Sequence, residues 1–330
     1  MRDATAKNAD AAPTEVDAAT LDAVSAAARA GLLGARKQLP PWLFYDARGS
    51  ALFEEITELP EYYPTRTERA ILERDADAIV DTAGPPLEIV ELGAGSAAKT
   101  EVLLEALLRR QPRVRYLPLD VSSAALASAR ARLRRLRRVT VQPILARYPE
   151  GLQLPPPPDG QRRLVLFLGS NIGNSDPAGA RGLLSAVARA LRPGDALLLG
   201  ADHRKSARLL LPAYDDAQGV TARFNMNVLQ RLNRELDADF DLDSFRHVAV
   251  WNARRSRVEM HLESTRGQRV PLRALDATVS FARGERIHTE SSYKLTPVRI
   301  RQLLARAGFR PEADWTDARR WFGLYLGRRG

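Results

Sequence analysis

A regular alternation of strand-like and helix-like segments between residues 87 and 202 is the feature that most constrains the fold of this chain. Short apolar runs such as LEIVEL and RRLVLF are typical of buried strands, and amphipathic segments such as KTEVLLEALLRRQ separate them. Strands that alternate with helices of about 10–15 residues indicate βαβ units, whose right-handed crossovers build a parallel sheet. The sequence therefore predicts an α/β protein with a doubly wound parallel sheet.

The alternation stops after about Lys205. Helical spacing at 209–216 and 221–236 is followed by alternating runs between 244 and 295, which are typical of antiparallel strands. A helix that starts with Pro297 and two short C-terminal strands then resume the first pattern. A segment of a different kind thus interrupts the βα pattern, which is completed after it.

This interruption predicts one discontinuous sheet domain and a second, smaller α+β domain. Upstream of the first strand, helical spacing at 17–33, 50–59 and 65–80 surrounds an ordered loop rich in aromatic residues and proline. We expect this segment to join the insert, because both lie outside the βα pattern. The expected division is 1–67 for the N-terminal tail and helical segment of the second domain, 68–204 for the sheet domain, 205–295 for the inserted part of the second domain, and 296–330 for the C-terminal part of the sheet domain.

The chain of 330 residues carries a formal net charge of +10, which makes a nucleic-acid partner one class to consider. Only five of its 50 basic residues are lysines. We interpret this bias as a solvated, arginine-rich surface, and the densest basic run, at 130–138 on a predicted helix, as a solvated helix face. We therefore expect no nucleic-acid partner.

Other classes of site are excluded by residues that the sequence lacks. It has no cysteine, which excludes a disulfide framework, a thiolate nucleophile and a cysteine-ligated zinc site. Its four histidines are not spaced as metal ligands, so no metal site is expected. Because no apolar stretch approaches the ~20 residues of a membrane span and the N-terminus does not resemble a secretory signal, we expect a cytoplasmic protein without membrane contact.

A glycine loop, GAGSAA, follows the first predicted strand. Glycines let a cofactor approach the backbone, and open α/β sheets bind ligands at the carboxyl ends of their strands. The second strand ends at Asp120, which lies 25 residues after Gly95 and can accept hydrogen bonds from both ribose hydroxyls of an adenosine. An NAD(P) fingerprint is satisfied in its looser form. Glu91, two residues before the loop, favours the cationic cofactor S-adenosylmethionine (SAM) instead, unless Glu91 caps a neighbouring helix.

Five segments give a more specific indication: LPPWLFYDARGSALFEEITELPEYYPTRTE, VELGAGSAAKT, FLGSNIGN, AYDDAQGVTARFNMNVLQRLNRELDADFDLDSF and TESSYK. In this order they resemble the L-histidine Nα-methyltransferases of ergothioneine biosynthesis, and the resemblance extends from about Leu32 to the end of the chain. It implies a Rossmann-like class I SAM methyltransferase sheet with a second, substrate-binding domain. It also implies conversion of L-histidine, through its mono- and dimethyl forms, to Nα,Nα,Nα-trimethyl-L-histidine (hercynine) in three steps. We expect the protein to be a monomer.

The resemblance assigns cofactor-binding roles residue by residue. It implies that Gly93, Lys99 and Asp120 bind SAM, with Asp120 on the ribose, and that Tyr148 flanks the adenine. One position departs from the family pattern. Arg147 stands where the family has an aspartate that reads the adenine amino group, and a guanidinium has no hydrogen-bond acceptor.

The same resemblance implies a substrate site with no metal. Asn174 and Tyr214 would hold the α-carboxylate of histidine, and Glu290 and Ser292 would hold its imidazole ring. Residues two apart in a strand point to one face, which lets the last two meet one ring. The remaining roles fall to Tyr62 as a further substrate-binding residue, to Met260 beside the ring, and to Tyr45 as the catalytic residue near the reacting amine.

Three other functions compete with this interpretation. The protein would be a methyltransferase of another amino acid such as tryptophan, a basic RNA-binding methyltransferase, or an NAD(P) dehydrogenase. Glu290 argues against tryptophan, because a carboxylate buried beside an indole would be poorly paired. An RNA-binding protein would need a contiguous basic face with exposed aromatic residues.

Overall fold

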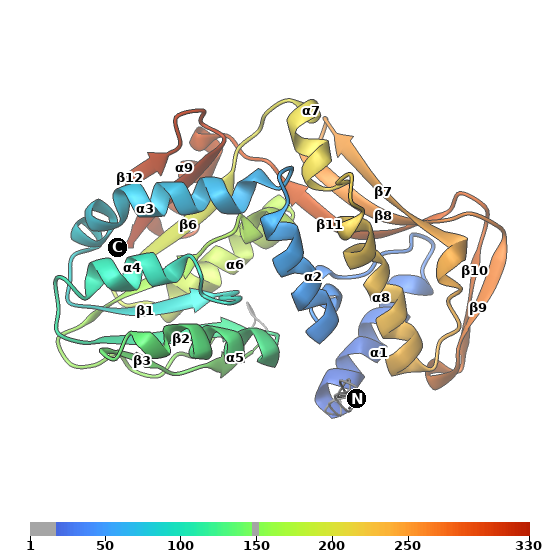
Figure 1. Ribbon diagram of the computed structural model, residues 1–330, viewed down its shortest axis with the longest axis horizontal. Coiled ribbons are helices and arrows are strands. Elements are labelled where there is room, and N and C mark those ends of the chain that lie inside the picture. Colours follow the sequence, from blue (N-terminus) through green and yellow to red (C-terminus); the bar gives the residue numbers. More distant parts are fainter. Residues whose placement is uncertain (1–17, 147–151) are drawn as a thin grey trace, which may run out of the picture.

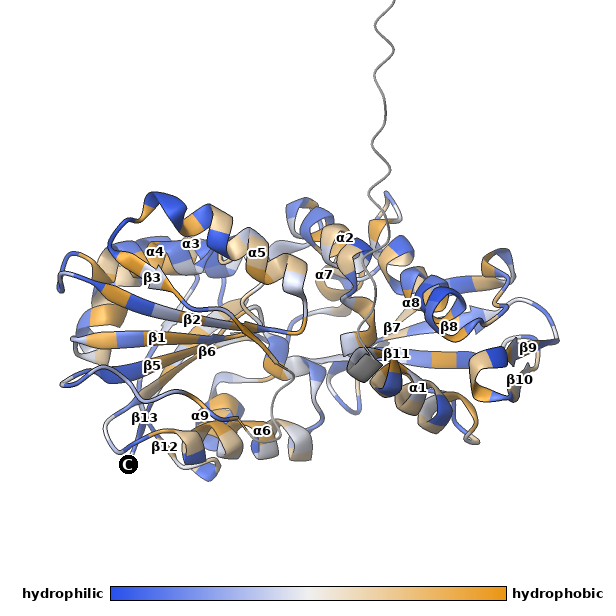
Figure 2. Ribbon diagram, turned by 90° about the horizontal axis from the view of Figure 1, so that it is seen from below, coloured by the Kyte–Doolittle hydropathy of each residue, from blue (hydrophilic) through white to orange (hydrophobic). Residues whose placement is uncertain are grey.

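The computed structural model describes residues 18–146 and 152–330, so that two positions of interest, Arg147 and Tyr148, lie outside the described residues. A sheet covered by helices on both faces forms one half of the molecule, and a smaller assembly of antiparallel strands and helices forms the other (Figures 1 and 2). The C-terminus belongs to the first half, and α1 (Ala18–Leu32) belongs to the second.

The larger sheet has eight strands, in the order β12-β13-β6-β5-β1-β2-β3, with β4 also paired to β2. The strands β1, β2, β3, β4, β5 and β6 pair in parallel, whereas β13 runs antiparallel to both of its neighbours. The predicted doubly wound parallel sheet is thus confirmed. The strand bounds are β1 (Leu87–Leu92), β2 (Val114–Asp120), β3 (Val139–Val141), β4 (Ile144–Leu145), β5 (Arg162–Phe167), β6 (Ala196–Asp202), β12 (Phe309–Thr316) and β13 (Phe322–Arg329).

Two layers of helices bury the two faces of this sheet (Figure 2). One apolar cluster joins β1 side chains such as Ile89 to α3, α4 and α5, and a second joins Val90 to α6 and α9. Adjacent residues of one strand thus serve opposite layers, as the two-residue period of a strand requires. The helices are α3 (Tyr63–Ala83), α4 (Thr100–Leu107), α5 (Ser123–Arg132), α6 (Pro177–Ala190) and α9 (Pro297–Arg306).

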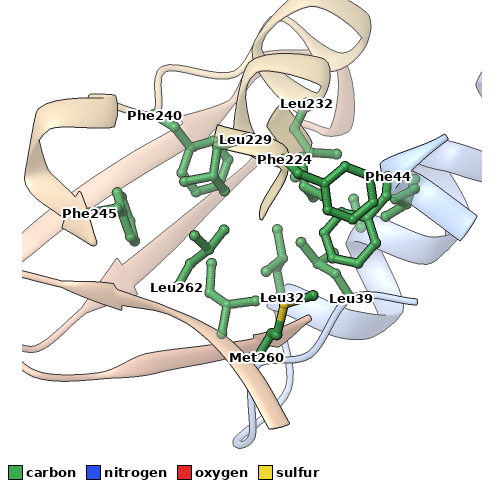
Figure 3. Packing of buried hydrophobic residues seen from close by; sticks show 14 of the residues in the cluster. Leu32, Leu39, Phe44, Phe224, Leu229, Leu232, Phe240, Phe245, Met260 and Leu262 are labelled. Carbon is green, nitrogen blue, oxygen red and sulfur yellow. The ribbon is translucent and has the colours of Figure 1, made fainter. Parts of the chain in front are cut away.

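The smaller half is built around a three-stranded antiparallel sheet, in the order β11-β8-β7, and a two-stranded pair, β9 with β10. Its apolar cluster draws on residues 24–63 and 210–287, and Figure 3 shows how Phe44 and Phe224 meet within it. The elements are η1 (Pro41–Phe44), α2 (Ala47–Glu58), α7 (Ala207–Leu210), η4 (Leu211–Ala213), α8 (Val220–Leu236), β7 (Phe245–Asn252), β8 (Arg257–Ser264), β9 (Gln268–Leu272), β10 (Ala277–Phe281) and β11 (Arg286–Tyr293).

We propose that the predicted division of the chain into two discontinuous domains holds, on the support of these separate apolar clusters. The N-terminal segment also bonds to the insert through the backbone, because Leu39 N donates to His288 O (2.8 Å) and His288 N donates to Lys37 O (2.9 Å). The helix α3 spans the predicted boundary at 67/68. Its first residue, Tyr63, belongs to the smaller half's cluster, and Ile71 belongs to the sheet's cluster.

Two predicted elements are shorter or split in the structure, and a proline lies at each break. The strand predicted over 139–146 is divided into β3 and β4 around Pro143, which has no N–H to donate to the ladder. The helix predicted at 209–216 is the short α7 followed by the 3-10 turn η4, which contains Pro212.

Gly49 provides a test of how η1 sits on the first turn of α2. A Cβ at this position would lie 1.6 Å from the backbone oxygen of Phe44. This clash is with the backbone, so it cannot be relieved by rotation of a side chain. We expect Gly49→Ala to lower the free energy of unfolding by roughly 2 kcal/mol or more, measured by chemical denaturation. The matched control is Gly182→Ala in α6, where a Cβ would meet nothing within 4 Å. This substitution should stabilise the helix by about 0.5–1 kcal/mol. Equal effects of the two substitutions would contradict the close contact.

Candidate active site

A hollow lies at the carboxyl ends of β1 and β2, which we call the loop hollow. Gly93 and Gly95 both have positive φ angles, 68° and 53°. The Asp120 carboxylate accepts a hydrogen bond from Gly95 N (3.0 Å) through one oxygen and from Ser122 N (2.9 Å) through the other. The residues that line the loop hollow are Pro41, Trp42, Tyr45, Ser50, Phe53, Glu54, Gly93, Gly95, Asp120, Val121, Ala125, Phe167, Asn171, Asn174, Ser175, Gly179 and Leu183.

Glu91 does not face this hollow, which corrects one argument for SAM. Its side chain lies on the face of β1 that α4 covers, and its carboxylate accepts hydrogen bonds from the hydroxyls of Thr100 (2.6 Å) and Tyr116. Burial raises the pKa of Glu91 to about 7, although both hydrogen bonds oppose the shift. Glu91 anchors the first turn of α4, which agrees with the alternative interpretation of this residue.

Lys99 also has a structural partner. Its ammonium pairs with the fully buried carboxylate of Glu68 in α3, which in turn accepts hydrogen bonds from Gly169 N at 2.9 and 3.0 Å. Lys99 therefore helps to hold the loop after β5 beside the start of α4, and it is not among the described residues that line the loop hollow. Its role as a SAM contact stays a prediction.

A second hollow, which we call the tyrosine hollow, lies between the two halves of the molecule. All residues predicted to act on the substrate line it, although they come from the end of η1, the residue before α3, the turn after β5, the end of η4, and the strands β8 and β11. They are Tyr45, Tyr62, Asn174, Tyr214, Met260, Glu290 and Ser292. The sequence prediction missed several other lining residues, namely Phe53, Ile56, Pro64, Gly169, Ser170, Asn171, Asp202, Ala213, Thr221, Phe224 and Lys294.

The two hollows share part of their walls. Tyr45, Phe53, Asn171 and Asn174 line both of them, so a molecule in one hollow lies next to a molecule in the other. Tyr45 and Phe53 meet edge to face, with ring centroids 5.8 Å apart. The shared wall is thus partly aromatic and partly amide.

Glu290 brings an acid into the interior of the tyrosine hollow. It lies in β11 opposite Met260 of β8, next to a β-bulge that begins at His288. Burial raises the pKa of Glu290 to about 7, and the nearby Lys294 ammonium lowers it only in part. Burial also raises the pKa of Tyr62, and Tyr214, Tyr45 and Glu290 add to that effect. The hollow therefore presents neutral hydroxyls around the carboxyl group of Glu290.

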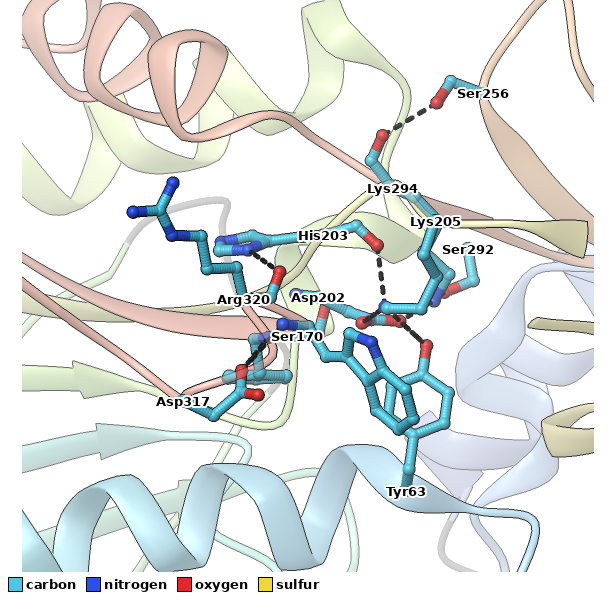
Figure 4. A network of polar contacts seen from close by, with 12 residues as sticks. Tyr63, Ser170, Asp202, His203, Lys205, Ser256, Ser292, Lys294, Asp317 and Arg320 are labelled. Atoms are coloured by element: carbon cyan, nitrogen blue, oxygen red, sulfur yellow. Dashed lines mark hydrogen bonds and ion pairs between the residues drawn. The ribbon is translucent and has the colours of Figure 1, made fainter. Parts of the chain in front are cut away.

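A network of charged groups forms the side of the tyrosine hollow nearest to β6 (Figure 4). The Asp202 carboxylate pairs with Lys205 (2.5 Å) and Lys294 (2.7 Å) and accepts a hydrogen bond from the Tyr63 hydroxyl (2.7 Å). Lys294 also donates to Tyr214 Oη (2.6 Å). The sequence analysis did not predict that these residues would meet.

A doubly wound sheet with a glycine loop after its first strand, an acid at the end of its second, and an adjoining second hollow is the arrangement of α/β proteins that bind an adenosine-containing cofactor next to a second ligand. The chain matches the family model of the histidine-specific, SAM-dependent methyltransferases over residues 24–329, and it belongs to that family.

Curated relatives agree with this assignment. Histidine N-alpha-methyltransferase of Mycolicibacterium smegmatis is 48% identical over 302 residues, which cover 91% of this chain and 93% of the relative. The protein of the same name from Mycobacterium tuberculosis is 48% identical over 297 residues, covering 90% and 92%. Ergothioneine biosynthesis protein 1 of Neurospora crassa is 30% identical over 295 residues, which cover 88% of this chain but 33% of that longer protein.

A membrane-spanning helix and a cluster of metal ligands are both absent from the part of the chain that the structure describes. Within residues 18–146 and 152–330, no helix has the length and apolar character needed to cross a membrane. In the same part of the chain, no group of three or more His, Asp or Glu side chains is placed to hold a metal ion.

The raised pKa of Glu290 predicts a pH-dependent effect of Glu290→Gln on stability. The folded-state pKa of about 7 lies above the usual 4.5, so ionisation of this carboxylate destabilises the fold. The destabilisation is absent below pH 4.5, increases between pH 4.5 and pH 7, and is complete above pH 7. We expect the variant to exceed the parent in free energy of unfolding by up to ~3 kcal/mol at pH 8 and to match it at pH 4, measured by chemical denaturation.

Glu285→Gln is the control for this experiment. A hydrogen bond from Lys37 lowers the pKa of Glu285, so that its ionised form stabilises the fold. This substitution should lower stability at pH 8 and have less effect at pH 4. A gain for Glu290→Gln that is as large at pH 4 as at pH 8 would contradict the assignment of a raised pKa.

Proposed function

We propose that this protein transfers methyl groups from SAM to the α-amino nitrogen of L-histidine, three times in succession, to give Nα,Nα,Nα-trimethyl-L-histidine. The observation that carries this proposal is the shared wall of the loop hollow and the tyrosine hollow. All side chains predicted to touch histidine line the second hollow, and Tyr45 and Asn174 also line the first. The family membership and the names of the relatives support the same reaction.

The residues of the loop hollow fit an adenosine-containing cofactor. A Cβ at Gly95 would meet nothing within 4 Å, which shows that the backbone at this position faces open space. A ligand in the loop hollow would be able to approach the backbone there without meeting a side chain. Asp120 lines the same space with its carboxylate. SAM supplies, when bound, a methyl group on a sulfonium centre that an amine nitrogen attacks in line. We assign Gly93, Gly95 and Asp120 to its binding, while Lys99 and Tyr148 stay predictions.

The side chains of the tyrosine hollow support a role in orienting the substrate. Glu290 would accept a hydrogen bond from an imidazole N–H, and Ser292 would serve the other ring nitrogen. The Asn174 amide, on the shared wall, would donate to the α-carboxylate. The Tyr214 hydroxyl already bonds to Ser292 and Lys294, so its predicted role on the carboxylate competes with these bonds.

Two tyrosines of the tyrosine hollow, Tyr45 on the shared wall and Tyr62, explain how the hollow would hold increasingly methylated amines. The substrate ammonium must lose a proton before its nitrogen has a lone pair that can attack, and correct orientation would then supply most of the rate enhancement. Tyr45 and Tyr62 would orient the neutral amine through their hydroxyls. Their ring faces would attract the methylated cations by cation–π contact, which favours retention of the mono- and dimethyl intermediates.

A direct assay tests this proposal against the other candidate functions. Purified protein incubated with SAM and histidine should yield a product with up to three added methyl groups by mass spectrometry, whereas tryptophan and RNA should gain none. No mass gain on histidine, or a greater gain on tryptophan, would overturn the proposal. A monomeric state, a cytoplasmic location and the lack of a nucleic-acid partner stay predictions.

Glu290→Ala tests the assignment of the imidazole site. Loss of a hydrogen bond to a charged acceptor inside a desolvated pocket should lower kcat/KM for histidine roughly 100-fold. The control is Glu285→Ala, which removes a carboxylate just before β11 that lies outside the tyrosine hollow and pairs with Lys37. Unchanged kcat/KM in Glu290→Ala would remove Glu290 from the substrate site.

A further inference from the structure

The side chain of Lys294 is fully buried and lines the tyrosine hollow, yet the proposed function gives it no role. Its ammonium has three N–H groups, and the structure gives each one an acceptor. These are Asp202 Oδ2 (2.7 Å), Tyr214 Oη (2.6 Å) and Ser292 Oγ (2.9 Å). Asp202 and Tyr214 together raise the pKa of Lys294, although burial opposes them, so the group stays charged.

The contacts of Lys294 restrict the directions in which the hydroxyls of Tyr214 and Ser292 can donate. An ammonium only donates, so the oxygens of Tyr214 and Ser292 must both accept from Lys294. The same two oxygens lie 2.8 Å apart and share a hydrogen bond. The pair holds two protons, of which one is used between the oxygens. The other proton is committed neither to Lys294 nor to the partner hydroxyl, so it is available to a ligand in the tyrosine hollow, which both residues line.

We propose that Lys294 is a positioning residue for the Tyr214–Ser292 pair. By donating to both hydroxyl oxygens, Lys294 leaves Ser292 with one O–H that donates to a ring nitrogen of the substrate. A ring nitrogen that accepts this bond carries no proton, so the site selects the neutral imidazole. In this arrangement Tyr214 donates to Ser292, and Ser292 donates to the nitrogen that carries no proton. The other ring nitrogen donates to Glu290. The inference rests on the proposed function, because it takes the imidazole to lie between Glu290 and Ser292.

Electrostatics favours this direction of the chain of hydrogen bonds. The Lys294 ammonium lies next to Ser292, and a positive charge there disfavours an imidazolium ring, which would present an N–H to Ser292. A hydroxyl that accepts from an ammonium is also a stronger donor, because hydrogen bonds in a chain polarise one another. In a variant without Lys294, both hydroxyl oxygens lose the donor that restricts their protons, and Ser292 no longer presents a fixed donor.

Lys205 offers a matched control within the same network. It is a second lysine on the Asp202 carboxylate, and its ammonium also has three acceptors, namely Asp202 Oδ1 (2.5 Å), Tyr63 Oη (2.8 Å) and His203 O (2.8 Å). Its side chain is nearly as buried as that of Lys294. None of its bonds reaches Ser292 or Tyr214, so Lys205→Met removes the same kind of charge without changing the donor.

The experiment compares binding of ring analogues by isothermal titration, in the presence of S-adenosylhomocysteine, to the wild type and to Lys294→Met and Lys205→Met. The 4- and 5-thiazolylalanine isomers each keep one of the two ring nitrogens as a hydrogen-bond acceptor, and thienylalanine has none. We expect the wild type and Lys205→Met to bind the better thiazolylalanine at least about tenfold more tightly than thienylalanine. In Lys294→Met this preference should fall below about threefold.

A second measurement separates positioning from a general loss of structure. Ser292→Ala should abolish the same preference, and adding Lys294→Met to it should cause no further loss of preference, because the two residues act through one donor. If Lys294→Met alone fails to fold, Lys294→Met/Asp202→Asn replaces it, with Asp202→Asn as its reference, so that no unpaired carboxylate is left buried.

The possible results have distinct meanings. If Lys294→Met retains the preference for thiazolylalanine over thienylalanine, or if Lys205→Met loses it equally, the role of Lys294 is overturned. The proposed function is unaffected by that result as long as the wild type binds histidine. A wild type that does not bind histidine overturns the proposed function and this inference with it. Loss of preference confined to Lys294→Met and Ser292→Ala supports the inference.

Discussion

The buried carboxylate of Asp202 is the interaction on which the arrangement of the substrate-binding side of this molecule depends. It lies at the carboxyl end of β6 and holds together Lys294 after β11, Lys205 and the Tyr63 hydroxyl at the start of α3. Removal of such ionised groups from water costs several kcal/mol per ion, and the cost is offset only when each proton and lone pair has a partner. Two segments distant in the sequence, the start of α3 and the residues after β11, are therefore fixed relative to the sheet by an ion pair and a hydrogen bond, whereas the interior of the smaller half is held by apolar packing.

Much of the fold follows from patterns that act over short distances in the sequence. The two-residue period of the strands and the spacing of the helices predicted the sheet, and β1 shows why, since Ile89 and Val90 serve opposite helical layers. The predicted elements differ from the structure at two prolines. Pro143 divides one predicted strand and Pro212 shortens one predicted helix, because neither residue can supply the N–H that the regular element needs.

The site was predictable only in part. The resemblance named seven of the residues that line the tyrosine hollow, and the strand period correctly placed Glu290 and Ser292 on the same hollow. The same period extends two residues further to Lys294, which is the signal that was available for this residue. Glu91 and Lys99 illustrate the limit of local reasoning. Each has a buried partner on another element, Tyr116 on β2 for one and Glu68 on α3 for the other, and sequence spacing does not indicate which charged groups a fold will bring together.

The shared wall between the loop hollow and the tyrosine hollow has a thermodynamic consequence. Because Tyr45, Phe53, Asn171 and Asn174 line both spaces, a ligand that orders these side chains on one side prepares them for a ligand on the other. Linkage requires that the effect be reciprocal, so that each ligand changes the affinity for the other by the same factor. The order in which the two ligands arrive then alters the route but not the stability of the ternary complex.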